Sequence, residues 1–548
     1  MGSVALGRAA RTFVLALLGA CGGALATLWV THAGPFAPRA GTLEARVVDD
    51  ATGTPMAARV AVTDANGTPL ALEGPHEQVR QLGKRWSYVD GAFTVAVPAG
   101  GATIEIRRGL ETRPLVEQVP GGGPGEPARR TFRLRRWANL HDEGYVSGDL
   151  HAHLPALDVA ASQMRAEDLD ALNLLVLGGM PLANDGSFTG RPDARSSPGH
   201  QIFLSQEIID WHLGHLTLAG VRSLVPGYPV PCGTLEYWTS HPHCDAYRGG
   251  RAARGQGALV SLAHFENLPG AGTPVAVALG LLDALEIPTW SDPMQLPAHL
   301  EAWNASGIPT ADFTPMRGVD FYYQYLNAGF RLPIAAGTDK SGDDIPVGSN
   351  RVYARAAKSG GFAGWLEGIK AGTGFVTNGP LLEFDVDGRA AGEEVAFEGA
   401  RTVRVRATAR SIVPFTTLEV VMNGVPVAHA LKLVQANPPV DGVYTLQTEA
   451  VVRLERSSWL AARAFADPDI TPRLLPRESS AFAHTNPVYF LRDGRRVRED
   501  GSIAYLRKAV NGLLHWLSTQ PTFASEADRA AVRRDAEEAL RVYDSLEP

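Results

Sequence analysis

The chain has 548 residues, of which 45% are hydrophobic and 20% are charged, and its formal net charge is −7. This composition excludes a disordered chain, and the lack of a basic stripe argues against a nucleic-acid partner. The length exceeds what one hydrophobic core usually supports, so several domains are expected.

The first forty residues are typical of an export segment. Arg8 and Arg11 precede an uncharged, largely apolar stretch over 12–31, and a basic start before such a stretch indicates secretion. Three outcomes stay open: cleavage after Ala33, lipidation at Cys21 as in bacterial lipoproteins, or retention as a single-span anchor. Each predicts an exported protein of the periplasm or cell envelope, and lipidation or retention also predicts membrane association through the N-terminus.

The next region, 41–138, predicts a small β-sandwich. Hydrophobic and polar residues alternate over 43–49 and again over 91–98, and Asp64–Gly67 is a hairpin-turn signal between them. The region resembles the transthyretin-like, carboxypeptidase-regulatory-like modules of exported enzymes.

Between 139 and 380, short apolar runs alternate with helix-length segments. Such runs predict strands buried on both faces, and strands in series with helices predict a parallel sheet. In closed parallel barrels the functional groups lie at the carboxyl ends of strands. Several of these runs adjoin polar residues that can bind metal: His151, His153, Glu207, His215, His264 and Asp339.

The remainder of the chain predicts two further units. Strand patterns with Gly and Pro turns over 381–495 indicate a second β-sandwich. The tail, 496–548, predicts amphipathic helices, because apolar residues recur at helical spacing over 503–517.

The pair His151 and His153 starts the functional argument. Side chains two residues apart in an extended chain point to the same side, so two imidazoles can hold one divalent transition metal. A lone pair of this kind is weak evidence. Together with the carboxylates and imidazoles that adjoin later runs, it predicts a metal-dependent hydrolase.

The stretch Gly148–His153, followed by Glu207, His215, His264 and Asp339, also resembles the polymerase-and-histidinol-phosphatase (PHP) superfamily, and within it the carbaryl-hydrolase-like metallohydrolases. The resemblance implies an α/β fold: a distorted (β/α)7 PHP-like barrel, flanked by the N-terminal transthyretin-like sandwich and a C-terminal β-rich domain with a helical tail. It also implies hydrolysis of phosphoesters, esters or carbamates.

The departures from the family pattern all concern ligands of the same metal ion. The chain has Val159, Gly178–Met180 and Lys340–Ser341 where members with three metals carry ligands of the third ion. The resemblance therefore implies a binuclear centre with two divalent ions, zinc first and manganese or iron as alternatives. The implied first ion is held by His151, His153, Glu207 and Asp339, and the second by Glu207, His215 and His264, with Glu207 bridging.

Three residues are candidates for the chemistry beyond metal binding. Two cations about 3.5–4 Å apart hold a water between them and lower its pKa toward 7. Asp339 is expected to orient the resulting bridging hydroxide and to move its proton, although a helix N-cap is an alternative. Lys340 offers a cation for an anionic substrate or oxyanion, or is a solvated surface residue. Arg351 is either a clamp for a carboxylate or phosphate, or structural.

The segment between Cys232 and Cys244 has two readings. In an oxidising compartment the pair predicts a disulfide near the mouth of the site. The alternative is a structural zinc held with His241 and His243, but the crowded spacing is poor for a tetrahedral site.

Two functions stay open. The first is an exported hydrolase that cleaves an ester, amide, carbamate or phosphoester in a small-molecule or polymer substrate. The alternative is a non-catalytic surface or polysaccharide-binding protein built on an inactive barrel. Aromatic residues could line a substrate pocket, with core packing as the alternative: Trp211, Tyr237, Trp238, Trp290, Tyr322 and Tyr323. The sequence does not determine the substrate, because loop side chains set specificity on such scaffolds.

Overall fold

The computed structural model describes residues 41–81, 83–121, 125–153, 156–176, 188–225, 242–266, 269–297, 316–357, 360–431, 439–467, 480–519 and 522–546. The predicted export segment with Cys21 lies outside the described residues, as do Gly178–Met180, Cys232, Tyr237, Trp238 and His241. Among the described helices, none combines the length and apolar character needed to cross a membrane.

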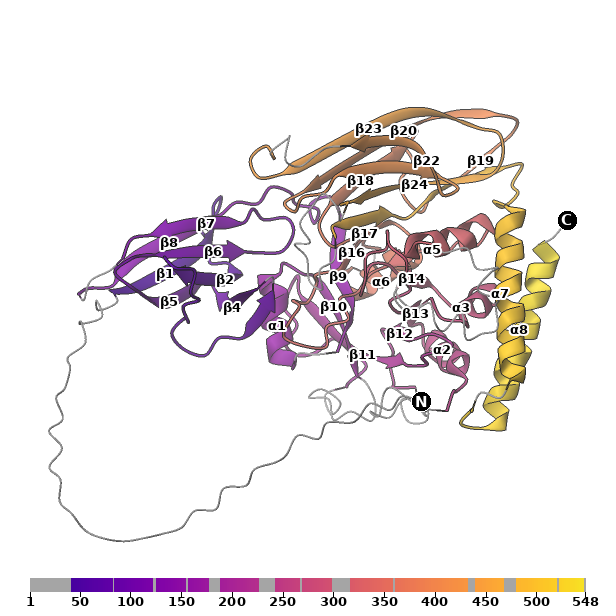
Figure 1. Ribbon diagram of the computed structural model, residues 1–548, viewed down its shortest axis with the longest axis horizontal. Helices are drawn as coiled ribbons and strands as arrows, with labels where there is room; N and C mark the ends of the chain where they lie inside the picture. Colours follow the sequence, from indigo (N-terminus) through magenta and orange to yellow (C-terminus); the bar gives the residue numbers. More distant parts are fainter. Residues whose placement is uncertain are drawn as a thin grey trace, which may run out of the picture.

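The N-terminal unit consists of two sheets around one core, at the left of Figure 1. Alternation along the first strand directs Leu43, Ala45 and Val47 inward, where they are buried. One sheet has the order β5 (Ala92–Val97), β1 (Gly41–Asp49), β8 (Ala128–Leu134). The other has the order β3 (Gln78–Gln81), β4 (Lys84–Asp90), β2 (Ala57–Asp64), β6 (Ala102–Arg107), β7 (Leu115–Val119).

The central unit is built on a mixed sheet with nearly all of its strand residues buried. Its path begins β15 (Ile334–Ala335), β14 (Ala284–Glu286), β13 (Leu259–Leu262), β12 (Leu216–Ala219), β11 (Gln201–Ile208), β10 (Ala171–Val176), β9 (Tyr145–Ala152), β16 (Arg351–Arg355), β17 (Gly374–Thr377). Its helices are α1 (Leu157–Ala166), α2 (Ala246–Gly255), α3 (Thr273–Ala278), α5 (Gly318–Asn327) and α6 (Gly361–Lys370).

The predicted (β/α)7 barrel is wrong. Strands outnumber helices in the described chain, and β12 runs antiparallel to both β11 and β13. The physical reason is the length of the connection: the residues between Ile208 and Leu216 are too few for a crossover helix, which needs a dozen or more. In addition, β16 pairs antiparallel with β9, and the sheet continues into the C-terminal strands instead of ending with the barrel.

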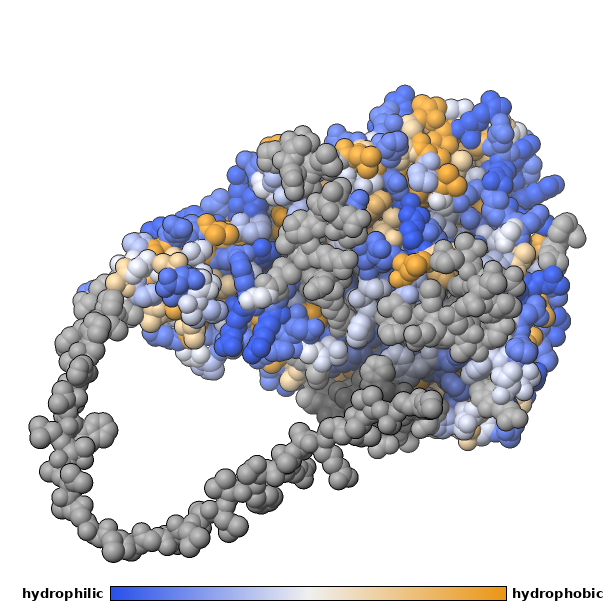
Figure 2. Space-filling view, viewed as in Figure 1, coloured by the Kyte–Doolittle hydropathy of each residue, from blue (hydrophilic) through white to orange (hydrophobic). Residues whose placement is uncertain are grey.

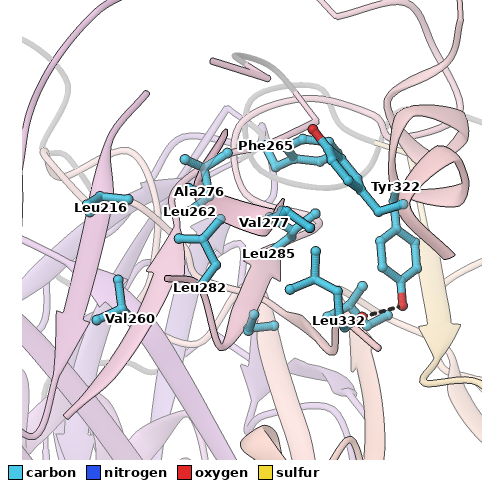
Figure 3. Close-up of a cluster of buried hydrophobic side chains, with 14 of the residues drawn as sticks. Leu216, Val260, Leu262, Phe265, Ala276, Val277, Leu282, Leu285, Tyr322 and Leu332 are labelled. Atoms are coloured by element: carbon cyan, nitrogen blue, oxygen red, sulfur yellow. Dashed lines mark hydrogen bonds between the residues drawn. The ribbon is translucent and has the colours of Figure 1, made fainter. Parts of the chain in front are cut away.

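The core of the central unit lies between the sheet and its helices. Figure 3 shows Leu262 and Leu285 from adjacent strands beside Val277 and Leu282, with Tyr322 of α5 donating its hydroxyl to the Leu332 carbonyl at 2.9 Å. Burying each such leucine contributes about 1.5–3 kcal/mol, so this packing fixes the strand ends that carry the polar residues.

The C-terminal unit shares its main sheet with the central one. From β17 the path continues through β25 (Phe482–Thr485), β24 (Ser458–Phe465), β21 (Thr417–Met422) and β22 (Val425–Leu431), with β26 (Val488–Arg492) and β19 (Glu394–Phe397) attached. A second sheet consists of β18 (Leu381–Val386), β20 (Arg401–Ser411) and β23 (Tyr444–Leu454). Its strands share one hydrophobic core with the C-terminal strands of the main sheet. Figure 2 shows hydrophobic residues on the upper surface, over these strands.

The chain ends in two long helices, α7 (Asp500–Ser518) and α8 (Glu526–Leu546), which stand at the right of Figure 1. They contact each other and α3, and α7 also contacts α5. The Tyr543 hydroxyl donates to the Pro274 carbonyl at 2.8 Å and joins α8 to α3. The helical tail therefore covers the outer helices of the central unit.

A buried histidine at the joint of the two units predicts acid sensitivity. His484 Nδ1 donates to the Thr485 carbonyl at 2.6 Å, so Nε2 accepts from the Tyr323 hydroxyl at 2.7 Å and the imidazole is neutral. Burial lowers the pKa of His484 to about 3, and the positive charge of Arg463 adds to this effect. Because the unfolded chain binds a proton near pH 6.5, the free energy of unfolding should fall as the pH drops from 6.5 toward 3.

The replacement His484→Gln tests this expectation. Urea unfolding at pH 7 and pH 5 should show an acid-induced loss that is smaller in this variant by on the order of 1 kcal/mol per pH unit. The exposed His429, replaced by glutamine, is the control and should leave the pH dependence unchanged. Equal acid-induced losses in both variants would contradict the assignment.

Candidate metal centre

The six predicted ligand residues converge at one edge of the central sheet. His151 lies near the end of β9, with His153 just beyond it, and Glu207 lies near the end of β11. His264 follows β13. His215 precedes β12, and because that strand is antiparallel its start lies at the same edge as the end of β11.

Asp339 reaches this edge through the segment that follows β15. The Leu150 amide donates to the Ala336 carbonyl at 3.2 Å, and the Asp339 amide donates to the His151 carbonyl at 2.7 Å. His153 in turn donates its amide to the Lys340 carbonyl at 3.0 Å. These backbone bonds place the Asp339 carboxylate directly beside both imidazoles of the histidine pair.

The first group of candidate ligands is His151, His153 and Asp339. All three are buried, and one donor atom from each lies within 4.8 Å of the others. The two Nε2 atoms are 3.0 Å apart, and Asp339 Oδ1 lies 3.5 Å from Nε2 of His151 and 3.2 Å from that of His153. Two imidazoles and a carboxylate that face one point are a ligand set for a divalent transition metal.

The second group is Glu207, His215 and His264. These three residues are also buried, and one donor atom from each lies within 4.8 Å of the others. Glu207 Oε1 lies 3.1 Å from His215 Nδ1 and 3.9 Å from His264 Nε2. Its other oxygen, Oε2, lies 3.3 Å from His153 Nε2. The Glu207 carboxylate therefore stands between the two groups, with one oxygen directed to each.

The charges in the cluster fit metal ions. Among the described residues, the ring nitrogens opposite those that face Glu207 and Asp339, which are His153 Nδ1, His215 Nε2 and His264 Nδ1, are buried without a hydrogen-bond partner. Burial lowers the pKa of His264 to about 3, whereas for His151 the charges of Glu286, Asp339 and Glu207 outweigh burial and raise the pKa to about 10. Buried carboxylates thus draw a proton to His151 where no cation is bound, and a metal ion would displace it.

Two of the ligands have strained backbones. His264 and Asp339 have positive φ angles, 34° and 47°, which residues with a Cβ atom rarely adopt. Such conformations cost on the order of 1–3 kcal/mol each and persist where the surroundings impose them, most often at functional sites. The packing around the cluster therefore holds both side chains in their inward directions.

Gly337 is needed for the close approach of the Asp339 segment to β9. A Cβ atom at this position would lie 2.2 Å from the His151 Cβ and 2.8 Å from its backbone nitrogen. Gly337→Ala should push the segment away from His151, lower the free energy of unfolding by about 1–3 kcal/mol and weaken metal binding. Thermal unfolding and metal content measure both effects.

Gly501→Ala on α7 is the matched control for this prediction. A Cβ atom there meets nothing within 4 Å, so this variant should keep wild-type stability and metal content. Wild-type metal content in Gly337→Ala would show that the segment can shift without disturbing the ligands.

Sequence reasoning missed the residues that orient His151. Nδ1 of His151 donates to Glu286 Oε2 at 2.9 Å and lies 3.2 Å from Thr217 Oγ1, which leaves Nε2 directed at the ligand group. Glu286 closes an apolar run just as Glu207 does, and that signal was present in the sequence. Asp149 instead accepts from the backbone amides of His151, Thr338 and Gly348, and so fixes the loops around the site.

Lys340 and Arg351, predicted to contact substrate, are both buried and bonded to backbone carbonyls. Lys340 Nζ donates to the carbonyls of Gly342 and Ile345, at 2.5 Å each. Arg351 donates to the carbonyl of Gly348 at 2.7 Å and to those of Glu167 and Asp168. For Lys340 these contacts differ from both the solvated and the substrate-facing alternative, and for Arg351 they agree with the structural alternative.

The predicted aromatic residues divide into two kinds. Tyr322 and Tyr323 are buried in the core. Trp211 and Trp290 are 37% and 40% exposed and lie beside the cluster: the Trp211 ring is 4.7 Å from that of His215, and the Trp290 indole donates to Asp339. Of the four predicted aromatic residues that the structure describes, Trp211 and Trp290 are therefore the two placed to meet a molecule bound at the site.

The structure describes only the last part of the segment between Cys232 and Cys244. Cys244 is disulfide-bonded, which excludes it as a thiolate ligand of the alternative zinc site. His243 Nδ1 lies 3.1 Å from each oxygen of Asp210, and the opposing charge of Asp210 outweighs burial and raises the pKa of His243.

Comparisons with known proteins give no relative: no family model, no curated protein and no solved structure matches the chain. The two buried groups of possible metal ligands are thus the firmest functional evidence.

Proposed function

We propose that this protein is an exported metal-dependent hydrolase that binds two divalent ions, zinc foremost, and cleaves an ester, amide, carbamate or phosphoester. The observation that carries the proposal is the position of Glu207 between two buried three-residue groups, with one oxygen directed to each. A fold that binds no metal has no need for six buried donor residues that face one another.

The chain's own residues define how such a centre would work. When bound, two divalent ions supply Lewis acidity and lower the pKa of a water molecule toward 7. Glu207 would be the shared ligand, His151 and His153 with Asp339 would hold one ion, and His215 and His264 the other. Asp339 is the proposed proton acceptor, because its carboxylate faces the Nε2 atoms of both histidines of the pair and is held by the Trp290 indole.

Two further features belong to this proposal. The order of the ligands along the chain resembles that of the PHP superfamily, and we propose a relation at the level of the ligand set, without the barrel.

Export is supported by the disulfide at Cys244, because disulfides persist in oxidising compartments. The N-terminal segment on which secretion or anchoring depends lies outside the described residues.

The proposal is tested with purified protein. Elemental analysis should find close to two equivalents of metal, and p-nitrophenyl esters or phosphates should be hydrolysed. Incubation with a chelator should abolish turnover, and added zinc, manganese or iron should restore it. Protein that contains no metal, takes none up and hydrolyses none of these substrates would overturn the proposal and favour the binding protein.

Asp339→Asn separates metal binding from proton transfer. An amide oxygen can still face the metal, but it cannot take up a proton at neutral pH. The variant should retain metal and lose turnover by about 10²–10⁴-fold, the contribution typical of a positioned general base. Full activity with bound metal would remove Asp339 from the mechanism.

A further inference from the structure

Trp290 holds one of the proposed ligands by a side-chain hydrogen bond. Its indole Nε1–H donates to Asp339 Oδ2, while Oδ1 of the same carboxylate faces the Nε2 atoms of His151 and His153. The two oxygens of Asp339 therefore have different surroundings. A carboxylate held in this way presents one oxygen to an ion and keeps the other occupied.

The loop that carries Trp290 is itself fixed by a buried carboxylate. Glu266 Oε1 accepts from the backbone amides of Thr289, Trp290 and Ser291, at 3.0, 2.6 and 3.0 Å. Glu266 is fully buried and lies two residues after the ligand His264. Three amides that converge on one oxygen leave this loop little freedom to move.

A second contact ties the same loop to the Asp339 segment. Asn350 Nδ2 donates to the Thr289 carbonyl at 2.8 Å and to the Gly337 carbonyl at 3.2 Å. The backbone on one side of Trp290 is thus joined to the backbone just before Asp339. The Asn350 side-chain amide therefore fixes the backbone next to Trp290 relative to the backbone that precedes Asp339.

Core packing does not explain Trp290, because its side chain is 40% exposed. The only polar atom of the indole ring is directed at Asp339. We infer that Trp290 is a positioning residue for the first metal group. Its loop is held by Glu266, and its indole determines which oxygen of Asp339 faces the ion. This inference rests on the proposed function and deepens it.

The test is metal binding by the full-length protein, measured by calorimetric titration of the metal-free form with zinc. Trp290→Phe keeps an aromatic ring and removes the N–H donor. The wild type should bind in two steps, and in the variant one step should weaken by about 10–100-fold, the loss typical when an outer-shell partner is removed. The other step, at the group with His215 and His264, should change little.

Two comparisons separate positioning from a general loss of structure. Trp137→Phe removes a part-buried indole whose Nε1–H donates to the Leu110 carbonyl outside the site, and it should keep both binding steps. Glu266→Gln keeps an acceptor for the three amides and should bind zinc nearly as wild type does, whereas Glu266→Ala should reproduce the effect of Trp290→Phe. Circular dichroism and thermal unfolding confirm that each variant is folded.

The outcomes distinguish this inference from the proposed function. A wild type that binds none of zinc, manganese and iron overturns the proposed function, and the inference with it. A wild type that binds two equivalents, with Trp290→Phe unchanged in both steps, overturns the inference alone. Equal weakening of both steps in that variant also overturns it, because a positioning role for Asp339 predicts an effect on one group.

Discussion

Replacing Glu207 with glutamine should remove high-affinity binding at both metal groups and, with it, the proposed hydrolysis. Glu207 approaches both groups: one oxygen lies 3.3 Å from His153 and the other 3.1 Å from His215. Loss of an outer-shell partner alone costs about 10–100-fold in affinity, so loss of a shared, charged ligand should exceed that at each group.

The electrostatics point in the same direction. The positive charges and hydrogen bonds of His151, His153 and His215 outweigh burial and hold the pKa of Glu207 well below its usual range. The carboxylate is therefore ionised at neutral pH and contributes a full negative charge to a water-poor site. Glutamine has the same shape and no charge, so the variant isolates the charge from the packing.

Elemental analysis and zinc titration of Glu207→Gln measure the effect, beside activity on p-nitrophenyl substrates. Glu398→Gln, which changes an exposed glutamate at a distance from the site, should leave metal content and activity unchanged. If Glu207→Gln retained two equivalents of zinc at wild-type affinity, Glu207 would not be a ligand and the binuclear arrangement would be refuted.

The second large effect is expected at Glu286. Its Oε2 accepts from His151 Nδ1 at 2.9 Å, and neither side chain is exposed. Because a ring nitrogen that donates to a carboxylate is protonated, the other nitrogen keeps its lone pair for a metal. Glu286→Leu should free the imidazole to rotate and weaken the step that involves His151 by about 10–100-fold.

Glu286→Gln is the matched variant, because an amide oxygen can also accept from His151 Nδ1. It should lie closer to wild type than the leucine variant does, both in zinc affinity and in turnover. Equal losses in the two variants would show that the charge of Glu286, and not its hydrogen bond, matters for the site.

The candidate ligands were visible in the sequence because each adjoins a short apolar run. The apolar runs before Asp339 and before His264 predict strands by local pattern alone. A polar residue at the end of such a run is easily recognised in the sequence. Glu286 has the same signature at the end of β14. Its role depends on a partner far along the chain, so the pattern could not show that it contacts His151.

The barrel prediction failed for a reason that local pattern does not contain. Buried strands have similar compositions whether they run parallel or antiparallel, so the sequence around β12 does not state its direction. The short connection between β11 and β12 decides it, because too few residues remain for a crossover. That reversal also puts His215 at the same edge as Glu207.

The candidate donor residues and most of the buried strands could be predicted from the chain alone, because both depend on residue type and short-range periodicity. Strand direction, the place of Glu207 between the two groups, and the contacts of Glu286 and Trp290 required the fold. Those features arise from contacts between segments that are distant along the chain, and such contacts are set by how whole strands pack.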